Sequence, residues 1–478
     1  MMITAAAEYS GAVSFFITDK GVLPLEQSNK MGTHSMGPLI FSMALPAMIS
    51  MLINALYNIV DSIFVARFST DALTAVSLVF PLQTLVIAIG VGTGVGVNSL
   101  IARRLGEKRQ QEADDAAEHG IVLSIISGFA FVLIGLFLSR PFLSLFTDNA
   151  SVLEQAVDYS RIAVGGSIFV IISIMFEKIQ QSTGDMIIPM CQGLFGAICN
   201  IILDPLLIFG IGPFPQMGIR GAAIATVIGQ ILGCVIGLWG AFRHQKTVKI
   251  NMRAFRWQGH TALDIYRVGL PGIIMQSVVS VMTAGMNVIL IQFSEIAVSV
   301  LGIYFKLQTF VFMPVFGLNQ GALPVMGYNY GARNKKRLMS AYKITLAGAV
   351  AIMVAGLVVF QIFPEQMIRL FNNDPEMLAV GVPALRIISI SFLGAAFGII
   401  NSTIFQAIGR GMASLIVSVC RQLLLILPAA WLLGRIYGLQ AVWYSFPIAE
   451  VAAFVISYAL LLRIYKTELR FMKPTAEE

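Results

Sequence analysis

Long apolar runs follow one another along almost the whole chain, and short stretches rich in charged residues separate them. A helix needs about 20 consecutive apolar residues to cross the hydrocarbon core of a bilayer. Runs of that length predict about twelve membrane-spanning helices, near residues 38–66, 72–102, 119–139, 159–183, 187–211, 219–241, 264–292, 296–328, 339–363, 382–409, 413–434 and 438–463. The pattern therefore predicts an all-α integral membrane protein.

The composition supports this fold class. Of the 478 residues, 57% are hydrophobic and 12% are charged. Soluble domains carry about 25% charged residues, so this chain has too little charge to cover a surface that faces water. That excludes a soluble enzyme, a nucleic-acid binder and a disordered protein.

Basic residues gather in alternate connections between the predicted spans. The second-to-third, sixth-to-seventh and eighth-to-ninth connections and the C-terminal tail carry four or five each, whereas the other connections carry mostly single ones. Connections rich in Lys and Arg lie on the cytoplasmic side of a membrane. We therefore expect a multi-pass protein of the cell (inner) membrane with both termini in the cytoplasm.

The chain also repeats itself. Identical residues recur 225 positions apart: Pro46 and Pro271, Gln83 and Gln308, Gly184 and Gly409. After the fifth span the offset falls to 220, as between Gly218 and Gly438. Each half holds six spans and so has the same orientation. The repeat predicts two six-helix lobes related by a pseudo-two-fold axis along the membrane normal, as in transporters that bind substrate between their lobes.

The repeat divides the chain into parts. We expect a cytoplasmic N-terminal segment at 1–35, an N-lobe at 36–242, a basic interlobe linker at 243–262, a C-lobe at 263–465 and a cytoplasmic tail at 466–478. A channel could share this hydropathy, but channels usually carry a filter-like motif and the sequence has none. A two-lobe transporter is the better interpretation.

Polar residues that a membrane helix should not contain gather in the N-lobe. Asn54, Tyr57 and Asp61 share one face of the first span, with Asn58 beside them. The fifth span carries Asn200 and Asp204, and the sixth carries Thr226 and Gln230, each pair four residues apart. Ionisable groups at membrane depth are costly and usually functional.

Three of these side chains should lie at one depth. The predicted topology places Asp61, Asp204 and Thr226 in the outward half of the bilayer. With Asn200 they form a set of hard oxygen ligands suited to Na⁺, and the carboxyls could equally carry a proton. The alternatives are that Asn200 and Thr226 only hydrogen-bond between helices, and that the acids form a structural pair or a helix-end charge.

The C-lobe carries buried charges that the repeat does not predict. Lys306 and Glu450 lie about 15–17 Å into the eighth and twelfth spans, at a rise of 1.5 Å per residue. A lone lysine at that depth is costly, so we expect the two to form a salt bridge. The alternative is that Lys306 faces the central cavity and is solvated there. Gln276 and Gln308 are further polar candidates in this lobe.

Two other patterns have a structural interpretation. Gly90, Gly92, Gly94 and Gly96 in the second span do not fit a nucleotide-binding loop and indicate close helix packing or a bend. Glu177 and Lys178, near the cytoplasmic end of the fourth span, are interpreted as a snorkelling pair, with a role in the cavity as the alternative.

At these polar residues the sequence resembles the multidrug and toxic compound extrusion (MATE) family. The matching stretches are Leu45-Pro46, Tyr57-Asn58-Ile59-Val60-Asp61, Gln181-Ser182-Thr183-Gly184-Asp185, and residues 200–205, 221–226, 314–321 and 327–332. The resemblance covers residues 36–465. It implies a V-shaped MATE/MOP-type fold and a secondary active multidrug efflux transporter. Such a protein exports cationic amphipathic compounds in antiport with H⁺ or Na⁺ by alternating access, and thereby confers antibiotic resistance.

The resemblance also implies which residues couple transport to an ion. In the DinF-like branch the cation site matches Asp61, Asn200, Asp204 and Thr226, the set found above from the polar pattern. In the NorM-like branch carboxylates act in the seventh and tenth helices, where this chain has Val279 and Ala395. We therefore expect the DinF-like pattern, with no C-lobe cation site.

Three alternatives belong to other classes. A lipid-linked oligosaccharide flippase of the same superfamily would need a cationic cavity, which the two interior acids disfavour. A major-facilitator transporter would show a different loop at residues 103–108. An intramembrane enzyme would need catalytic groups, but all four histidines lie at or beyond span ends: His34, His119, His244 and His260. We expect no enzyme, no cofactor other than the coupling ion and no nucleic-acid partner, but a monomer that binds lipid and small cationic or amphipathic molecules.

Overall fold

The computed structural model describes residues 30–244 and 247–472, which form helices joined by short connections and contain no strand within those ranges. Within these ranges ten helices are long and apolar enough to cross a membrane, and two bent helix pairs bring the number to twelve. The predicted all-α membrane fold is confirmed. The predicted N-terminal segment lies outside the described residues from 1 to 29, as does the tail from 473 to 478.

The N-lobe consists of the helices before the linker. They are α2 (Lys30–Thr33), α3 (Met36–Phe68), α4 (Thr70–Gly106), α5 (Gln110–Leu133) with the π-helical η2 (Ile134–Leu138) and α6 (Ser139–Leu143), α7 (Ala150–Ala163), α8 (Ser167–Ser182), α9 (Ile187–Phe209) and α10 (Ile219–Trp239) with η3 (Gly240–His244). The fourth predicted span is the bent pair of α7 and α8, which meet at 42°.

The C-lobe repeats this order. Its helices are α11 (Gly259–Leu290), α12 (Glu295–Gly331), α13 (Lys335–Ile362), α14 (Pro364–Arg369), α15 (Pro375–Ser389), α16 (Phe392–Ala407), α17 (Gly411–Val419), the π-helical η4 (Cys420–Ile426), α18 (Leu427–Tyr437), α19 (Leu439–Val442), α20 (Ser445–Thr467) and η5 (Leu469–Phe471). The bend of 42° recurs as 47° between α15 and α16.

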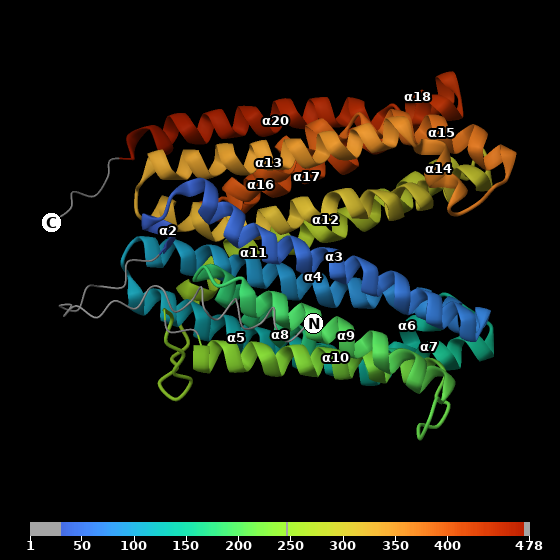
Figure 1. The fold of residues 1–478 in the computed structure, drawn as a ribbon, viewed down its shortest axis with the longest axis horizontal. Coiled ribbons are helices and arrows are strands. Elements are labelled where there is room, and N and C mark those ends of the chain that lie inside the picture. The colour runs from blue at the N-terminus through green and yellow to red at the C-terminus, as the bar shows by residue number, and fades with distance from the viewer. Residues whose placement is uncertain (1–29, 245–246, 473–478) are drawn as a thin grey trace, which may run out of the picture.

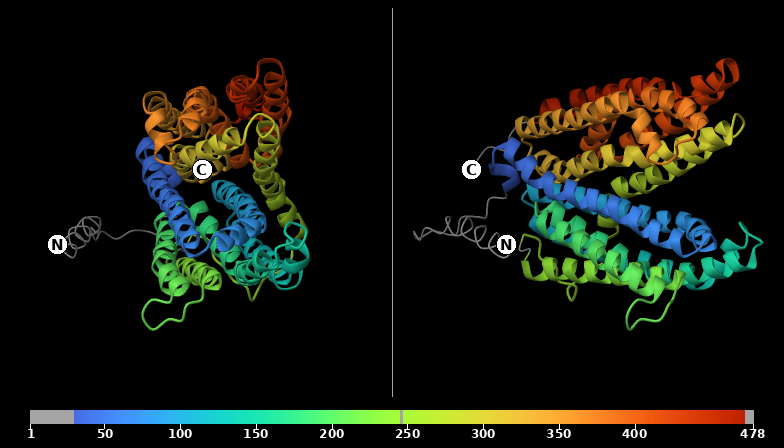
Figure 2. Two further views of the ribbon diagram at one scale, coloured as in Figure 1. Left: turned by 90° about the vertical axis from the view of Figure 1, so that its right-hand side faces the viewer. Right: turned by 45° about the vertical axis from the view of Figure 1, so that its right-hand side comes forward.

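The helices form two groups, with α3–α10 below and α12–α20 above in Figure 1. The start of α3 and the end of α20 lie at one end of the molecule, which we call the terminal end, and the α3–α4 and α9–α10 connections lie at the opposite, distal end. In the right-hand view of Figure 2 the two groups meet at the terminal end and diverge toward the distal end. This is the expected V-shaped arrangement of two lobes.

Local backbone features confirm the internal repeat. Helices α4 and α12 are both 37 residues long and start 225 positions apart. Ser69 and Ser294 cap them in the same way, each hydroxyl accepting a backbone N–H three residues on, at 2.9 and 3.1 Å. Just after the ends of these two helices, Lys108 and Arg333 adopt a positive φ in the left-handed region, and they are again 225 positions apart.

Glycines let the lobes approach at the terminal half. A Cβ on Gly317 of α12 would lie 2.5 Å from the backbone of Met48 in α3, and one on Gly321 would lie 2.7 Å from that of Ala44. No larger residue fits so close to another backbone. The lobes are therefore in direct contact along α3 and α12.

The glycine series of α4 acts in the same way, as the close-packing interpretation predicted. Gly92 and Gly96 face the backbone of α11 in the other lobe, whereas Gly90 and Gly94 face side chains of α8. The alternation follows from the helical period, since residues two apart point to different sides. One run of glycines thus serves both an intralobe and an interlobe interface.

The connection between the lobes lies against α5. The backbone N–H of Lys249 donates to Asp114 at 2.9 Å, and that of Asn251 donates to Glu118 at 2.8 Å. Helix α11 begins at Gly259, so the last residues of the predicted linker 243–262 are helical. Acidic side chains of the N-lobe therefore hold the start of the C-lobe in place.

Candidate functional site

The two acids of the N-lobe lie together at membrane depth. Asp61 lies near the end of α3 and Asp204 near the end of α9, and these helices pack against each other in the distal half. Their carboxyl groups hydrogen-bond to each other, and Asp204 is completely buried. A hydrogen bond between two carboxyls requires a proton on one of them. The pair can therefore hold a proton, or exchange it for another cation.

Asn200 and Thr226 lie beside the acids. The Asn200 side-chain N–H donates to the Thr226 hydroxyl at 3.3 Å, and that hydroxyl donates to the carbonyl of Ala222 at 3.0 Å. Both residues thus hydrogen-bond between or within helices, as the structural alternative predicted. Their oxygens nevertheless lie in the neighbourhood of the acids, so a part in cation binding stays a prediction.

Two tyrosines complete the cluster. The hydroxyl of Tyr57 from α3 hydrogen-bonds to Thr226 and lies close to both acids. Tyr159 from α7 is buried, and its hydroxyl accepts a hydrogen bond from Gln83 of α4 at 3.3 Å. Five helices thus contribute to one polar site: α3, α4, α7, α9 and α10.

Tyr159 and Gln83 are residues of this site that the sequence does not predict. Tyr159 stands at the edge of the fourth predicted span, where tyrosines are common at membrane interfaces. Gln83 was noted only as part of the repeat. Neither position carries a signal that would separate a site residue from an interfacial one, because the packing of distant helices decides whether their side chains lie near the acids.

The other predicted N-lobe residues contribute less. Asn58 is exposed, and its side chain donates to the carbonyl of Asn54 at 2.8 Å within α3. Gln230 lies one turn beyond Thr226, and its side-chain oxygen is buried without a hydrogen-bond partner among the described residues. Gln230 is therefore an additional oxygen near the cluster, whereas Asn54 and Asn58 make a local contact.

The predicted ion pair of Lys306 and Glu450 is wrong. Glu450 of α20 pairs with Arg421 of η4, with 3.4 Å between the guanidinium and the carboxylate. Lys306 is exposed, and its ammonium lies 6.0 Å from the ring centre of Phe371 near the distal end. Equal depth in two helices does not determine which faces they turn to each other. The long lysine side chain reaches along the surface instead.

The π-helical segment η4 brings Arg421 to Glu450. Such segments shift the register of a helix and are frequent at functional sites. Gly394 of α16 leaves the space that Glu450 occupies, since a Cβ on Gly394 would clash with the Glu450 side chain. Of the remaining C-lobe candidates, Gln276 is exposed and Gln308 is half-buried, and neither side chain hydrogen-bonds among the described residues.

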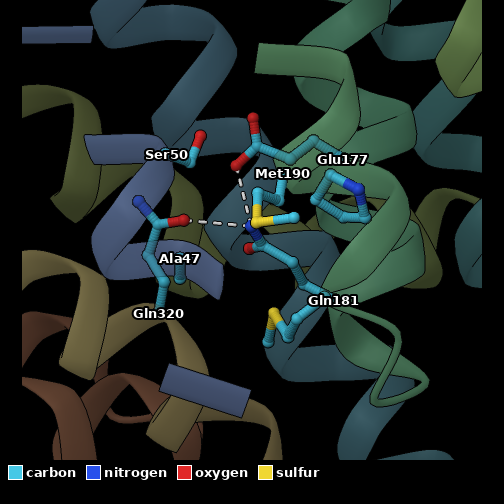
Figure 3. A pocket seen from close by; sticks show the side chains of 8 residues that line it. Ala47, Ser50, Glu177, Gln181, Met190 and Gln320 are labelled. Atoms are coloured by element: carbon cyan, nitrogen blue, oxygen red, sulfur yellow. Dashed lines mark hydrogen bonds between the residues drawn. The ribbon is translucent and has the colours of Figure 1, made fainter. Parts of the chain in front are cut away.

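A small pocket of about 10 Å³ lies between the lobes in their terminal half. Figure 3 shows Glu177 and Gln181 of α8 facing Gln320 of α12 across it. The snorkelling interpretation of Lys178 is wrong, because this residue is only 4% exposed. Its ammonium donates to Glu177 at 2.8 Å, Gln181 at 3.0 Å and Gln320 at 3.2 Å, the last from the other lobe.

Comparison with known sequences adds to this geometry. The sequence model of the MatE family matches residues 46–206 and 271–432, one segment in each lobe. The multidrug export protein MepA of Staphylococcus haemolyticus is 27% identical over 426 residues, which cover 88% of this chain and 93% of that protein. The FAD transporter of Shewanella oneidensis is 26% identical over 429 residues, which cover 90% and 95%.

Solved structures agree with the fold. A MOP superfamily transporter from Pyrococcus furiosus superposes with a TM-score of 0.87 at 27% identity, covering 95% of this chain and 100% of that one. The outward-facing conformation of a multidrug resistance MATE family transporter gives the same TM-score and coverage at 28% identity. These relatives are transporters, which disfavours an enzymatic activity.

Proposed function

The chain belongs to the MatE family, and from this premise we propose that it is a secondary active multidrug efflux transporter that exports cationic amphipathic compounds in antiport with H⁺ or Na⁺. The observation that carries the proposal is the hydrogen-bonded carboxyl pair of Asp61 and Asp204. A buried acid pair is costly unless it binds a cation, so it is suited to take up and release one in each cycle.

The proposed coupling site consists of Asp61, Asn200, Asp204 and Thr226, as in the DinF-like branch. Carboxylates, an amide and a hydroxyl are oxygen ligands that suit Na⁺, and the carboxyls alone suffice for a proton. The two acids act as one titrating unit because they share a hydrogen bond. Loading this unit reduces the negative charge of the acid pair, which lowers the free-energy cost of moving its helices within the membrane.

The proposal includes an orientation. Basic residues follow α4 and α12 at the terminal end, which supports a cytoplasmic position for that end and for both termini in a cell (inner) membrane. The described conformation then has its lobes in contact on the cytoplasmic side and diverging outward. Alternating access would break the contact of α3 with α12. A single chain contains both lobes and the site, so the functional unit is a monomer.

The test is transport into inverted membrane vesicles driven separately by a pH gradient and by a Na⁺ gradient. We expect uptake of a cationic dye such as ethidium with one of the two gradients, and its loss when an ionophore collapses that gradient. Uptake that ignores both gradients would exclude antiport. An anionic dye transported better than ethidium would exclude the cationic substrate class.

A second candidate substrate comes from the similarity to the FAD transporter of Shewanella oneidensis. FAD is anionic, so it differs in charge from the cationic class. Glu177, in the pocket between the lobes, and Asp61, within the N-lobe, both favour cations. The same vesicles with FAD in place of the dye decide between the two.

A further inference from the structure

We propose that the pocket lined by Glu177, Gln181 and Gln320 is a binding site for the positively charged head group of a cargo molecule. Lys178 acts there as an internal cation that occupies Glu177 until the cargo replaces it. This inference rests on the proposed function as an exporter of cationic compounds, and it adds a site separate from the coupling site.

Both lobes build the pocket. Its walls come from α3, α8, α12 and the start of α9: Ala47, Ser50, Glu177, Gln181, Met186, Pro189, Met190 and Gln320. A cavity of about 10–15 Å³ holds one water-sized group, and this pocket has a volume of about 10 Å³. It therefore has room for a single ammonium-sized group and is too small for a whole amphipathic molecule.

The carboxylate of Glu177 has capacity for a ligand. One oxygen, Oε1, accepts both the Lys178 ammonium and the Gln181 side-chain N–H, each at 2.8 Å. A carboxylate offers about four acceptor positions, and the second oxygen accepts no hydrogen bond among the described residues. Figure 3 shows it pointing away from Gln181. The Glu177 side chain is 24% exposed and that of Lys178 is 5% exposed, so a ligand can reach the acid.

Lys178 is held as an ion that belongs to the protein. An ammonium has three N–H donors, and here each has an acceptor: Glu177, Gln181 and Gln320. Gly94 of α4 leaves room for the lysine stem, since a Cβ there would lie 2.7 Å from its Cγ. Burying a charge in this way is costly. The pair of Lys178 and Glu177 is explained if Lys178 occupies the carboxylate that the cargo later binds.

The apolar part of the pocket suits cations of varied shape. Met186 and Met190 line it, and the Gln320 amide lies 3.7 Å from the sulfur of Met51. Thioethers are flexible and polarizable, and they adapt to different ligands. The pocket thus combines one carboxylate, that of Glu177, with a methionine wall that can adapt to ligands of different shape.

Binding at this pocket is linked to the contact between the lobes. Gln320 lies between Gly317 and Gly321, the residues at which α12 touches α3. The bond from Lys178 to Gln320 crosses this interface. A cargo ammonium on Glu177 repels the Lys178 ammonium, so occupancy of the pocket weakens a bond that holds the lobes together.

The pocket is distinct from the coupling site. Ser50, which lines the pocket, and Asp61 lie eleven residues apart in α3, about 16 Å at the usual rise per residue. A variant of either site can therefore be tested while the other stays intact.

The test measures equilibrium binding of phenethylamine, a primary amine that is protonated at neutral pH, to the purified full chain in detergent, without any gradient. Glu177→Gln should weaken binding at least tenfold. Lys178→Met and Lys178→Gln should strengthen it severalfold, because the competing cation is gone. The matched control is Glu154→Gln, which breaks the exposed pair of Arg140 and Glu154 and should leave binding unchanged. Size-exclusion profiles and thermal stability identify variants that fail to fold.

The opposite signs at the two partners distinguish a binding site from a purely structural pair. If both lysine variants fold and weaken binding as Glu177→Gln does, or if folded Glu177→Gln binds as the wild type does, the inference is wrong. Asp204→Asn should bind the probe normally and lose gradient-driven uptake. Wild-type protein that transports no cationic dye would contradict the proposed function instead, whatever the binding result.

Discussion

The two lobes share one helix plan but hold different charges in corresponding helices. In the N-lobe, Asp204 of α9 lies against Asp61, another carboxyl. In the C-lobe, the corresponding segment from α17 to α18 supplies Arg421, which pairs with Glu450. Glu450 stands 220 positions after Gln230, so the C-lobe charges are additions to the repeat. The N-lobe therefore holds two acidic groups in contact, whereas the acid of the C-lobe is neutralised by Arg421.

The difference indicates a division of labour between the lobes. Two carboxyls close together cannot both be ionised at low cost, so their state depends on a bound proton or cation. An acid and a guanidinium in contact have no net charge and need no further ion. We therefore expect the N-lobe to change its charge during the cycle, while the C-lobe keeps its own.

The largest expected effect follows removal of an N-lobe acid. Asp204→Asn should reduce gradient-driven dye uptake by inverted vesicles more than tenfold, to the level of passive leakage, because the remaining acid can no longer share a cation. Protein amount and thermal stability should stay close to wild type. The control is the double variant Arg421→Met with Glu450→Gln, which removes charge from the other lobe and should retain uptake. Normal uptake by Asp204→Asn would contradict the proposed division of labour between the two lobes.

The second effect concerns stability of the C-lobe. Replacing only Arg421 by Met should cost about 3–5 kcal/mol of unfolding free energy, since the buried Glu450 carboxylate is left without its partner. Replacing only Glu450 by Gln should cost less, because the Arg421 side chain is 24% exposed. Replacing both should cost much less than replacing Arg421 alone. Thermal unfolding of the four proteins in detergent measures this as a double-mutant cycle. Costs that simply add would show that the pair does not interact.

A smaller effect is expected at the neutral ligands of the N-lobe. Asn200→Ala and Thr226→Ala should each raise the concentration of coupling ion needed for half-maximal uptake by about tenfold, near 1.4 kcal/mol, a value within the range for a lost ligand or hydrogen bond. Uptake rates at saturating ion should change less. Thr403→Ala in α16 is the control, because among the described residues its hydroxyl forms a single bond, to a carbonyl of its own helix at 2.9 Å.

The smallest effect should come from Lys306. Its ammonium contacts the ring of Phe371 at an exposed site, where such an interaction contributes about 0.5–1 kcal/mol. Lys306→Met should therefore change stability by no more than that, and its effect should add to that of Glu450→Gln. A strong coupling between these two variants in thermal unfolding would instead support the ion pair of Lys306 and Glu450 that the sequence predicts.

Much of the fold could be predicted from the sequence because its signals are local or periodic. Runs of apolar residues report membrane spans directly, since each span must satisfy its backbone hydrogen bonds within itself. The offset of 225 located matching caps and left-handed residues such as Lys108 and Arg333, which the structure confirms. Asp61 and Asp204 could be recognised because acids are rare in membrane helices.

Contacts between helices were decided only in the tertiary structure. Depth along a span can be counted from the sequence, but the rotation of each helix cannot, which is why Glu450 was assigned to Lys306 instead of Arg421. The π-helical η4 and Gly394 of α16 determine that rotation. The burial of Lys178 escapes sequence reasoning for the same reason, since Gln320, 142 residues away, supplies its third acceptor. Side-chain type and spacing therefore determined which residues are unusual in this protein, whereas packing between distant helices determined their partners.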